Sequence, residues 1–359
     1  MVIAMSSFLS KRFEGIAAYV PGEQPQDRSY IKLNTNESPY PPSPRVLAAL
    51  NVAEASRLNL YPDPDTREAC AAIASSLGVR AENVIMGNGS DELLAFCFQA
   101  FCDVDTPAVY ADITYGFYSV FARINCVESR IIPLGGDFRI AARDYFNAGG
   151  TVFIANPNSP TGLELEYGDL VAILENNPDN IVVVDEAYAS FGVRSVVPLT
   201  SAYKNLIAVH TMSKSRNLAG ARIAYAIADE SLIGDLNIMK FSFNPYNVGR
   251  LSLLAAVAAI ADAGYYADCV ERSARTREKT AAELAARGFF VLPSKSNFIF
   301  TRPGFMRGKD YYLGLKELGI LVRHFGNERI SDFVRITIGN DEQMEKLIAA
   351  TDEMKAAFE

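Results

Sequence analysis

The sequence predicts an α/β fold with a large, mostly parallel sheet and a second, smaller α+β domain. Short apolar segments alternate with helix-like segments through the middle of the chain, an order typical of a parallel sheet covered by helices on both faces. With 359 residues, of which 49% are hydrophobic, the chain is long and apolar enough for about two domains. The alternating segments are Ala108–Tyr110, Tyr115–Arg123, Val127–Pro133, Thr151–Ala155, Leu165–Glu175 and Ile181–Val184.

The last third of the chain predicts the smaller domain. An alanine-rich helical stretch from Leu251 to Arg287 would link it to the large domain. We expect an arm and part of the small domain in residues 1–45, the large domain in residues 46–245, and the linking helix and small domain in residues 246–359. The predicted strands of the small domain are Phe289–Pro293, Asn297–Thr301 and Phe333–Ile338, and its predicted helices are Lys309–Leu318 and Glu342–Phe358.

The N-terminal arm is rich in turn-forming residues and leads into two predicted helices. The first helix is expected from Arg45 to Leu60, before the turn Tyr61-Pro62-Asp63-Pro64, where two prolines favour extended backbone. Asp65 is expected to cap the next helix, which runs to Leu77 and ends at Gly78.

Composition excludes several classes of function. A net charge of −8 argues against a nucleic-acid partner or an anionic membrane surface. The chain has two histidines, His210 and His324, which argues against a multi-histidine metal site, and we assign His324 no role. Five scattered cysteines without a CxxC pair fit a reducing compartment. No long apolar run or signal peptide is recognisable, so we expect a soluble, cytoplasmic protein.

A glycine-containing turn, Gly87-Asn88-Gly89-Ser90-Asp91, joins a short strand to a helix start. Free backbone N–H groups and the positive end of the helix dipole make such a start an anion site by geometry. The alternative is an ordinary helix cap, because Ser-Asp-Glu is also a favourable capping sequence.

A cationic, hydroxyl-rich loop lies between two apolar runs, Leu206–Val209 and Ile223–Ile227. It contains Ser213, Lys214 and Arg222, and a lysine held at a strand end can form an imine with an aldehyde. The alternative is a solvated basic loop.

Polar residues also follow two other predicted strands. Asn158 lies in a rigid turn after Thr151–Ala155, and Asp185 follows the apolar strand Ile181–Val184. A carboxylate at the end of a buried strand is costly unless a cation meets it, although Asp185 could instead cap a helix. Because ligands of parallel sheets collect at the carboxyl ends of the strands, we expect Asn158, Asp185 and Lys214 to converge.

Pyridoxal 5′-phosphate fits this set of groups. Its aldehyde would take Lys214, its ring nitrogen would pair with Asp185, and its ring would accept electrons from a substrate carbanion. Tyr115 is the expected stacking partner of the ring, although one aromatic residue there is more often part of the core. The phosphate would be bound by Gly89, Ser90, Asp91, Ser213 and Arg222, and the ring phenolate oxygen by Asn158 and Tyr188.

Together the motifs resemble those of the fold-type I pyridoxal-phosphate-dependent aminotransferases, and within that family the histidinol-phosphate aminotransferases. The resemblance covers nearly the whole chain and implies the fold-type I architecture and transamination in two half-reactions. The matching segments are Leu33–Pro39, Tyr61–Asp63, Gly87–Glu92, Asn156–Gly162, Asp185–Tyr188, Ser213-Lys214, Leu218–Arg222, Pro245–Asn247, Ser296–Phe298 and Val334–Gly339.

The resemblance also implies partners and substrate contacts. A homodimer is expected in which Tyr61 reaches the neighbouring subunit's cofactor phosphate and Tyr19 its substrate. Arg335, assisted by Arg323, would bind the carboxylate of glutamate in one half-reaction and the phosphate of histidinol phosphate in the other.

The chain departs from the family pattern at several positions, which leave the cofactor chemistry intact. Ser159, Ala221 and Ala224 stand where the family more often has Asn, Leu or Ile, and Gly, and Ser215-Arg216-Asn217 replaces the commoner Ala-Phe-Gly.

Other functions remain open from the sequence. An aromatic amino-acid aminotransferase or a threonine-phosphate decarboxylase would use nearly the same residues. A non-enzymatic regulator that binds the cofactor is disfavoured because Lys214, Asp185 and Arg222 are all present. A nicotinamide-dependent dehydrogenase is disfavoured because no GxGxxG motif follows the first strand.

Overall fold

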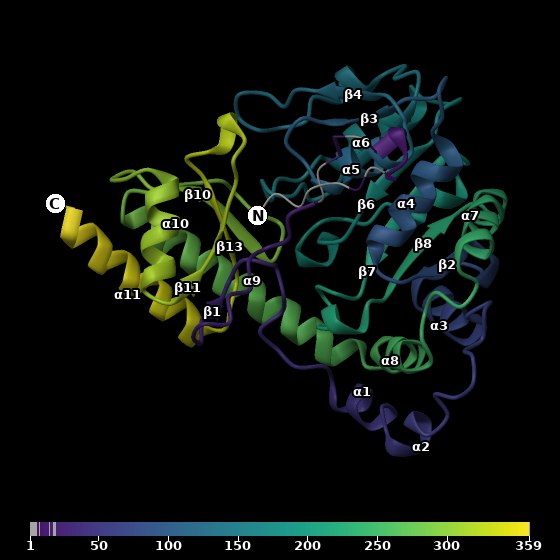
Figure 1. The fold of residues 1–359 in the computed structure, drawn as a ribbon, viewed down its shortest axis with the longest axis horizontal. Coiled ribbons are helices and arrows are strands. Elements are labelled where there is room, and N and C mark those ends of the chain that lie inside the picture. The colour runs from purple at the N-terminus through teal and green to yellow at the C-terminus, as the bar shows by residue number, and fades with distance from the viewer. Residues whose placement is uncertain (1–5, 7, 14, 17–18, 359) are drawn as a thin grey trace.

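The computed structural model describes residues 6, 8–13, 15–16 and 19–358 of the chain. Two lobes lie side by side, a large lobe around a central sheet and a smaller lobe that contains the C-terminus (Figure 1). The long helix α9 (Ala263–Ala286) extends from the large lobe into the small one. This arrangement agrees with the predicted large sheet domain and smaller α+β domain, while the boundaries at residues 45 and 245 stay predictions.

The large lobe contains a seven-stranded sheet with the order β2-β8-β7-β6-β5-β3-β4. The only antiparallel strand of this sheet is β8, which runs opposite to both of its neighbours, so the prediction of a mostly parallel sheet is confirmed. The strands are β2 (Val84–Gly87), β3 (Ala108–Ala111), β4 (Ser129–Ile132), β5 (Thr151–Ala155), β6 (Val182–Asp185), β7 (Leu206–Thr211) and β8 (Ala224–Ala228).

Helices cover both faces of this sheet because its central strands are apolar on both sides. Along β6, Val182 and Val184 belong to one buried cluster and Val183 to the other, as the two-residue period of a strand requires. The first cluster includes residues of α3 (Arg67–Leu77), α6 (Tyr167–Glu175) and α8 (Arg250–Ala261). The second includes residues of α4 (Ser90–Phe101), α5 (Phe117–Ile124) and α7 (Glu230–Phe243).

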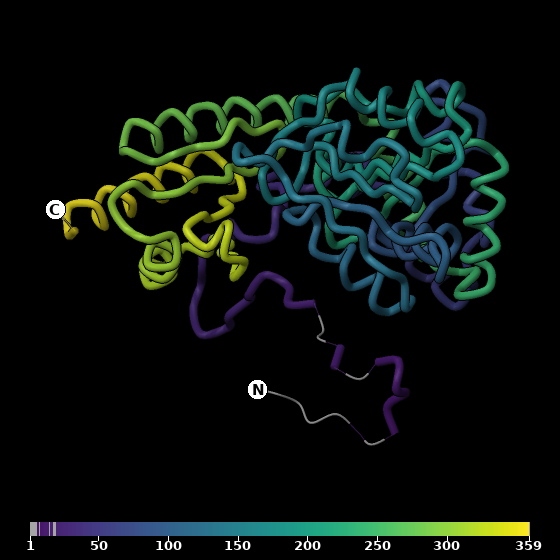
Figure 2. The backbone as a smooth tube through the Cα atoms, turned by 90° about the horizontal axis from the view of Figure 1, so that it is seen from above, coloured from purple at the N-terminus to yellow at the C-terminus, as the bar shows by residue number. Residues whose placement is uncertain are grey.

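The small lobe is built on a four-stranded antiparallel sheet with the order β12-β13-β10-β9. A separate strand of the arm, β1 (Ile31–Lys32), pairs in parallel with β11 (Ile320–Leu321). The part of the arm from residue 19 onward runs along the outside of the two lobes before it reaches this pairing (Figure 2). The other elements are β9 (Phe290–Val291), β10 (Phe298–Arg302), β12 (Arg323–His324), β13 (Val334–Thr337), α10 (Gly308–Glu317) and α11 (Asp341–Phe358).

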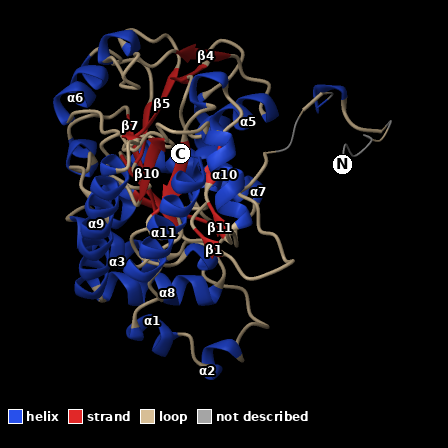
Figure 3. Ribbon diagram, turned by 90° about the vertical axis from the view of Figure 1, so that its left-hand side faces the viewer, coloured by secondary structure: helices blue, strands red, loops and turns tan. Residues whose placement is uncertain are grey.

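Three local predictions were wrong. The helix expected from Arg45 to Leu60 is two short helices, α1 (Pro44–Ala49) and α2 (Val52–Ala55), which lie at one end of the molecule (Figure 3). The break occurs at Asn51, whose side chain accepts a hydrogen bond from the backbone of Glu54 and so starts a new helix.

The second error concerns the start of α3. Its N-cap is Thr66, in a left-handed conformation, and not Asp65. The carboxylate of Asp63 accepts hydrogen bonds from the backbone N–H groups of Asp65 and Arg67, so it performs the capping role.

The third error concerns the linking helix, which breaks at Asp262 into α8 and α9 with a bend of 80°. Within the described chain, no single helix has the length and apolar composition of a membrane span; α8 and α9 meet those criteria only when taken together across this bend.

Phe153→Ala is expected to lower the free energy of unfolding by about 3–5 kcal/mol, because it removes a large buried side chain and leaves a cavity. Phe153 is 1% exposed, and its ring stacks on Phe98 at 4.1 Å between centroids. Urea unfolding of this variant should be compared with Phe358→Ala, whose ring is 62% exposed. Equal midpoints for the two variants would contradict the assigned core.

Candidate active site

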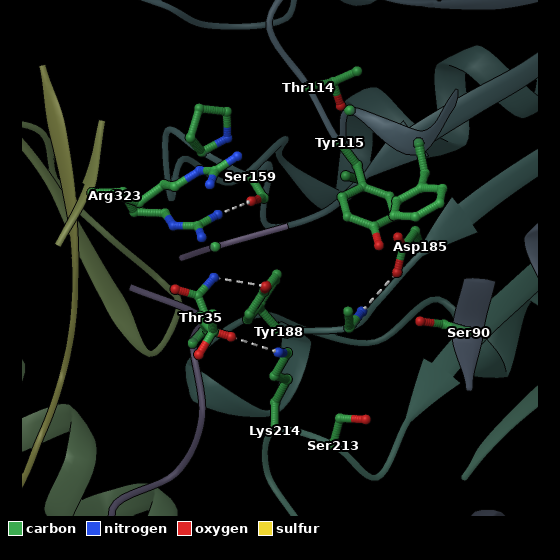
Figure 4. Close-up of a pocket in the computed structure, with 18 of the residues that line it drawn as sticks. Thr35, Ser90, Thr114, Tyr115, Ser159, Asp185, Tyr188, Ser213, Lys214 and Arg323 are labelled. Atoms are coloured by element: carbon green, nitrogen blue, oxygen red, sulfur yellow. Dashed lines mark hydrogen bonds between the residues drawn. The ribbon is translucent and has the colours of Figure 1, made fainter. Parts of the chain in front are cut away.

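A cavity of about 870 Å³ lies where the carboxyl ends of the central strands face the small lobe (Figure 4). Most of the predicted site residues line this cavity, so the predicted convergence is confirmed for Asp185 and Lys214. The predicted residues outside its lining are Gly89, Asn158 and Tyr61. Those that line it are Tyr19, Ser90, Asp91, Tyr115, Asp185, Tyr188, Ser213, Lys214, Arg222, Arg323 and Arg335.

Lys214 lies in the loop after β7 and extends its ammonium group into the cavity (Figure 4). Its Nζ donates a hydrogen bond to the backbone oxygen of Thr35 at 3.3 Å. The same Nζ lies 5.9 Å from the centre of the Tyr188 ring, whose hydroxyl accepts a hydrogen bond from Asn36 at 2.8 Å. Residues 35 and 36 of the arm therefore complete the wall next to the lysine.

Asp185 ends β6 and is 5% exposed. Its Oδ1 accepts a hydrogen bond from the backbone N–H of Ala187 at 3.0 Å, and its Oδ2 accepts one from the hydroxyl of Tyr118 at 3.5 Å. Burial raises the pKa of Asp185 to about 6, because desolvation disfavours the charged form. This carboxyl group would be stabilised in its ionised form by a cationic group bound in the cavity.

The turn before α4 forms an anion cradle together with Arg222. Gly89 has φ +85°, and a Cβ added to it would lie 2.3 Å from Nη2 of Arg222. Only a residue without a Cβ fits at position 89, because the guanidinium of Arg222 occupies that space. Gly89 itself does not line the cavity. Nη2 of Arg222 lies 3.6 Å from Asp91, and the start of α4 presents unpaired backbone N–H groups beside it.

Tyr115 lies between the anion cradle and the small lobe. Its hydroxyl donates a 2.5 Å hydrogen bond to Asp91, and its ring packs edge-on against Tyr118 at 5.8 Å. Burial raises the pKa of Tyr115 well above its usual value, so the hydroxyl stays a donor. The ring is thus fixed beside Asp185, where it can cover a planar ligand.

The expectation that Asn158 presents its amide to the cavity was wrong. Its amide nitrogen donates to the backbone oxygen of Ile113 at 2.9 Å and to Thr161 at 3.1 Å, and its oxygen accepts from Thr114 at 2.8 Å. These bonds tie the side chain to the segment that follows β3 and to Thr161 of its own turn. The next residue, Ser159, lines the cavity instead and accepts a hydrogen bond from Arg335 at 3.1 Å.

Arg335, on β13, reaches the cavity from the small lobe and is half-buried. Its Nη1 bonds to Ser159 and its Nη2 to the backbone oxygen of Asn34 at 3.2 Å, while its Nε is buried without a hydrogen-bond partner in the described chain. Burial lowers the pKa of Arg335, because the charged guanidinium is poorly solvated. Because Arg335 also lines the cavity, its guanidinium can bind a carboxylate or a phosphate there.

Arg323 and Tyr19 differ from their predicted arrangement. The guanidinium of Arg323 donates to the backbone oxygens of Val20 and Pro21 at 2.9 and 3.0 Å, so it anchors the arm at the cavity mouth. Tyr19 was expected at a neighbouring subunit, but it lines the cavity of its own chain and packs on Phe117 at 4.1 Å. The anchored backbone beside it explains this placement.

Sequence reasoning missed part of the cavity wall. Asn36, which had no assigned role, is 1% exposed, has φ 56° and bonds to Tyr188. An asparagine in a turn-rich segment is a recognisable candidate for this left-handed conformation. Within the part of the chain that the structure describes, no group of three or more His, Cys, Asp or Glu residues could hold a metal ion.

Comparison with known proteins identifies the family. Residues 28–350 match the family described as aminotransferase class I and II. The chain is a member of this family. It is 49% identical over 342 residues to a histidinol-phosphate aminotransferase of Brachyspira hyodysenteriae, covering 95% of this chain and 97% of that one. It is 46% identical over 350 residues to histidinol-phosphate aminotransferase 1 of Bradyrhizobium diazoefficiens, covering 98% of this chain and 100% of that one.

Several solved structures share the fold of this chain. A histidinol-phosphate aminotransferase from Sinorhizobium meliloti, in complex with pyridoxal-5′-phosphate, matches with a TM-score of 0.88 and 24% identity, covering 99% of this chain and 100% of that one. An L-threonine-O-3-phosphate decarboxylase from Porphyromonas gingivalis matches with a TM-score of 0.77 and 21% identity, covering 90% of this chain and 99% of that one. Likeness at this identity establishes the fold and not the substrate.

Gly89→Ala is expected to weaken anion binding at the cradle on the order of tenfold or more, because the new methyl group would displace Arg222 and strain the left-handed backbone. Phosphate protection against thermal unfolding measures this effect. Gly234→Ala, on α7, is the matched control, since an added Cβ there has nothing within 4 Å. Unchanged protection in Gly89→Ala would contradict the assigned cradle.

Proposed function

We propose that this protein is a pyridoxal-phosphate-dependent aminotransferase that converts histidinol phosphate and 2-oxoglutarate to imidazole acetol phosphate and glutamate. The observation that carries the proposal is the presence of Lys214 and the buried Asp185 in one cavity beside an anion cradle. Curated relatives with the name histidinol-phosphate aminotransferase, at 46–49% identity over nearly the whole chain, support the choice of substrate.

The cavity fits the cofactor at three points. Asp185 is buried and would be stabilised by a protonated ring nitrogen. Gly89 leaves room for Arg222 at the helix start, where a phosphate would be bound together with Ser90, Asp91 and Ser213. Lys214 extends into the same cavity. When bound, pyridoxal phosphate supplies an aldehyde that takes the amino group and a ring that accepts electrons from the substrate carbon.

The chain's own residues perform the proton and orientation steps. With the cofactor bound, the Lys214 amine would hold it through its aldehyde and would carry a proton to and from the substrate carbon. Asp185 would pair with the ring nitrogen and favour its protonated form, and the Tyr188 hydroxyl would donate to the phenolate oxygen. Tyr115 would cover the ring face. Asn158, whose amide is bonded to Ile113 and Thr161, lies outside the cavity lining, so its predicted bond to the ring would need its amide to be released.

One anion site would serve both substrates. Arg335 lines the cavity, and a planar guanidinium binds a carboxylate or a phosphate equally well. Glutamate would present its α-carboxylate there and histidinol phosphate its phosphate. Arg323 would assist by holding Tyr19 and the arm over the bound substrate.

We further propose a homodimer in the cytoplasm, with small-molecule substrates and neither nucleic acid nor membrane as a partner. An exposed apolar surface at one end of the large lobe supports the dimer, because surfaces of this kind commonly mark protein interfaces. Tyr61 is 77% exposed on this surface and would contact the partner's cofactor phosphate. Other exposed apolar residues of this end are Val52, Leu58, Leu60 and Phe243.

The proposed reaction is tested by separate half-reactions on the purified protein, followed by the absorption of the cofactor. Glutamate and histidinol phosphate should each convert it to the pyridoxamine form. A far better reaction with phenylalanine or tyrosine would identify an aromatic aminotransferase instead. Release of CO₂ from O-phosphothreonine without 2-oxoglutarate would identify a decarboxylase, and no cofactor spectrum at all would refute the cofactor assignment.

Lys214→Ala should lose the visible absorption of the bound cofactor and essentially all turnover, because no other amine takes its place in the assigned site. Lys204→Ala is the control, since this lysine is exposed and pairs with Asp229 away from the cavity. Substantial turnover by Lys214→Ala would exclude the assigned role.

Cofactor affinity should depend on pH through Asp185. Its pKa is raised to about 6 in the ligand-free protein, so the carboxyl is protonated below that pH and must lose its proton before it can pair with a ring cation. The ratio of the affinity of the wild type to that of Asp185→Asn should therefore fall as pH decreases through about 6. A ratio that stays constant between pH 5 and about 8 would contradict this pairing.

A further inference from the structure

A polar contact at Glu92 lies behind the anion cradle and takes no part in the reaction steps above. Oε2 of Glu92, in the first turn of α4, accepts a hydrogen bond from the backbone N–H of Asn88 at 2.7 Å. The same oxygen accepts a 2.5 Å hydrogen bond from the side-chain amide of Asn247. One carboxylate thus joins the turn that forms the cradle to the segment between α7 and α8.

That segment supports Tyr61. Asn247 is 4% exposed, and its neighbour Tyr246 stacks on the Tyr61 ring with 4.4 Å between centroids and 19° between the planes. Arg250, at the start of α8, lies within 3.4 Å of the backbone oxygen of Tyr61. Tyr61 itself remains 77% exposed, so its position depends on these few contacts.

A buried lysine holds the other end of the same turn. Lys240 is 1% exposed, and its Nζ donates to the backbone oxygen of Pro64 at 2.7 Å. Burial lowers the pKa of Lys240, and the neighbouring carboxylates of Asp65 and Glu92 partly offset this effect. The turn from Tyr61 to Pro64 is therefore held at one end by Tyr246 and Arg250 and at the other by Lys240.

We propose that Glu92 is a positioning residue for two cofactor sites at once. In its own subunit it orients the start of α4, where the phosphate binds. Through Asn247 and Tyr246 it also sets the position of Tyr61, which enters the partner's phosphate site. This inference rests on the homodimer of the proposed function and adds a physical connection between its two sites.

A simpler role would confine Glu92 to its own subunit. A glutamate in the first turn of a helix commonly caps the backbone, and the bond to Asn88 alone would do so. In that case its removal would weaken cofactor binding only where the glutamate is missing. The two roles therefore differ in what happens in the partner's site.

Dimers made of two different chains can distinguish these two roles of Glu92. Two differently tagged chains are co-expressed, and the hybrid is purified through both tags. In the decisive hybrid, one chain is wild type and the other carries Lys214→Ala and Glu92→Ala. The only Lys214 then lies in a site with its own Glu92 intact, but with Tyr61 supplied by the altered chain. The reference hybrid carries Lys214→Ala alone in the second chain.

The readout is the loss of pyridoxal phosphate from the site that retains Lys214. Borohydride added at intervals fixes the remaining cofactor to Lys214, and mass spectrometry of the wild-type chain counts it. We expect loss on the order of tenfold faster in the decisive hybrid than in the reference, the scale of one lost charge-assisted hydrogen bond. A rate equal to that of the reference overturns the proposal.

Three further variants, one of them a control, keep the result interpretable. Glu92→Gln in place of Glu92→Ala should stay close to the reference, because the amide oxygen can accept both hydrogen bonds. Asn247→Ala should reproduce the faster loss without touching α4, and a slow rate for it would also overturn the proposal. Glu68→Ala, in the exposed first turn of α3, is the matched control and should behave like the reference.

Failure of the proposed function gives a different result. If the two tagged chains do not co-purify, the homodimer is wrong and the inference falls with it. If the reference hybrid retains no cofactor on Lys214, the cofactor assignment itself is wrong. A stable reference hybrid with unchanged loss in the decisive hybrid overturns the inference alone.

Discussion

The buried carboxyl of Asp185 is the constraint around which the rest of the site is arranged. It lies at the end of a central strand, where neighbouring apolar strands exclude water and raise its pKa to about 6. A carboxylate in that position is stabilised only by a cation or by donors directed at it. The cavity, the flanking Tyr115 ring and the Lys214 loop leave room for a flat, cationic ring beside it.

The arrangement of the large lobe was predictable because local sequence patterns decide it. Apolar runs of four to six residues specify strands such as β6 and β7 that are buried on both faces, and the parallel topology then places Asp185 and Lys214 at the same edge. Gly89 was recognisable from the turn that precedes α4. These inferences need only the pattern of apolar residues along the chain and the chemistry of the residues at the strand ends.

The remaining parts of the site depend on contacts between distant residues. Asn158 and Ser159 are adjacent in a turn, and the bonds of Asn158 to Ile113 and Thr114 decide which of the two faces the cavity. Arg323 meets the arm some three hundred positions away in the sequence. The helix breaks at Asn51 and Asp262 likewise arise where caps and packing override a continuous helical pattern.

The pairing of β1 with β11 has a consequence for how the chain folds during synthesis. Ile31 lies beside Ile320, so the first strand has no partner until almost the entire polypeptide has left the ribosome. The strands of the large sheet, by contrast, all fall between Val84 and Ala228 and become available much earlier. Because domains generally fold as units while synthesis proceeds, the sheet can form first. The mouth of the cavity, where Thr35 and Asn36 meet Lys214 and Tyr188, is then assembled last.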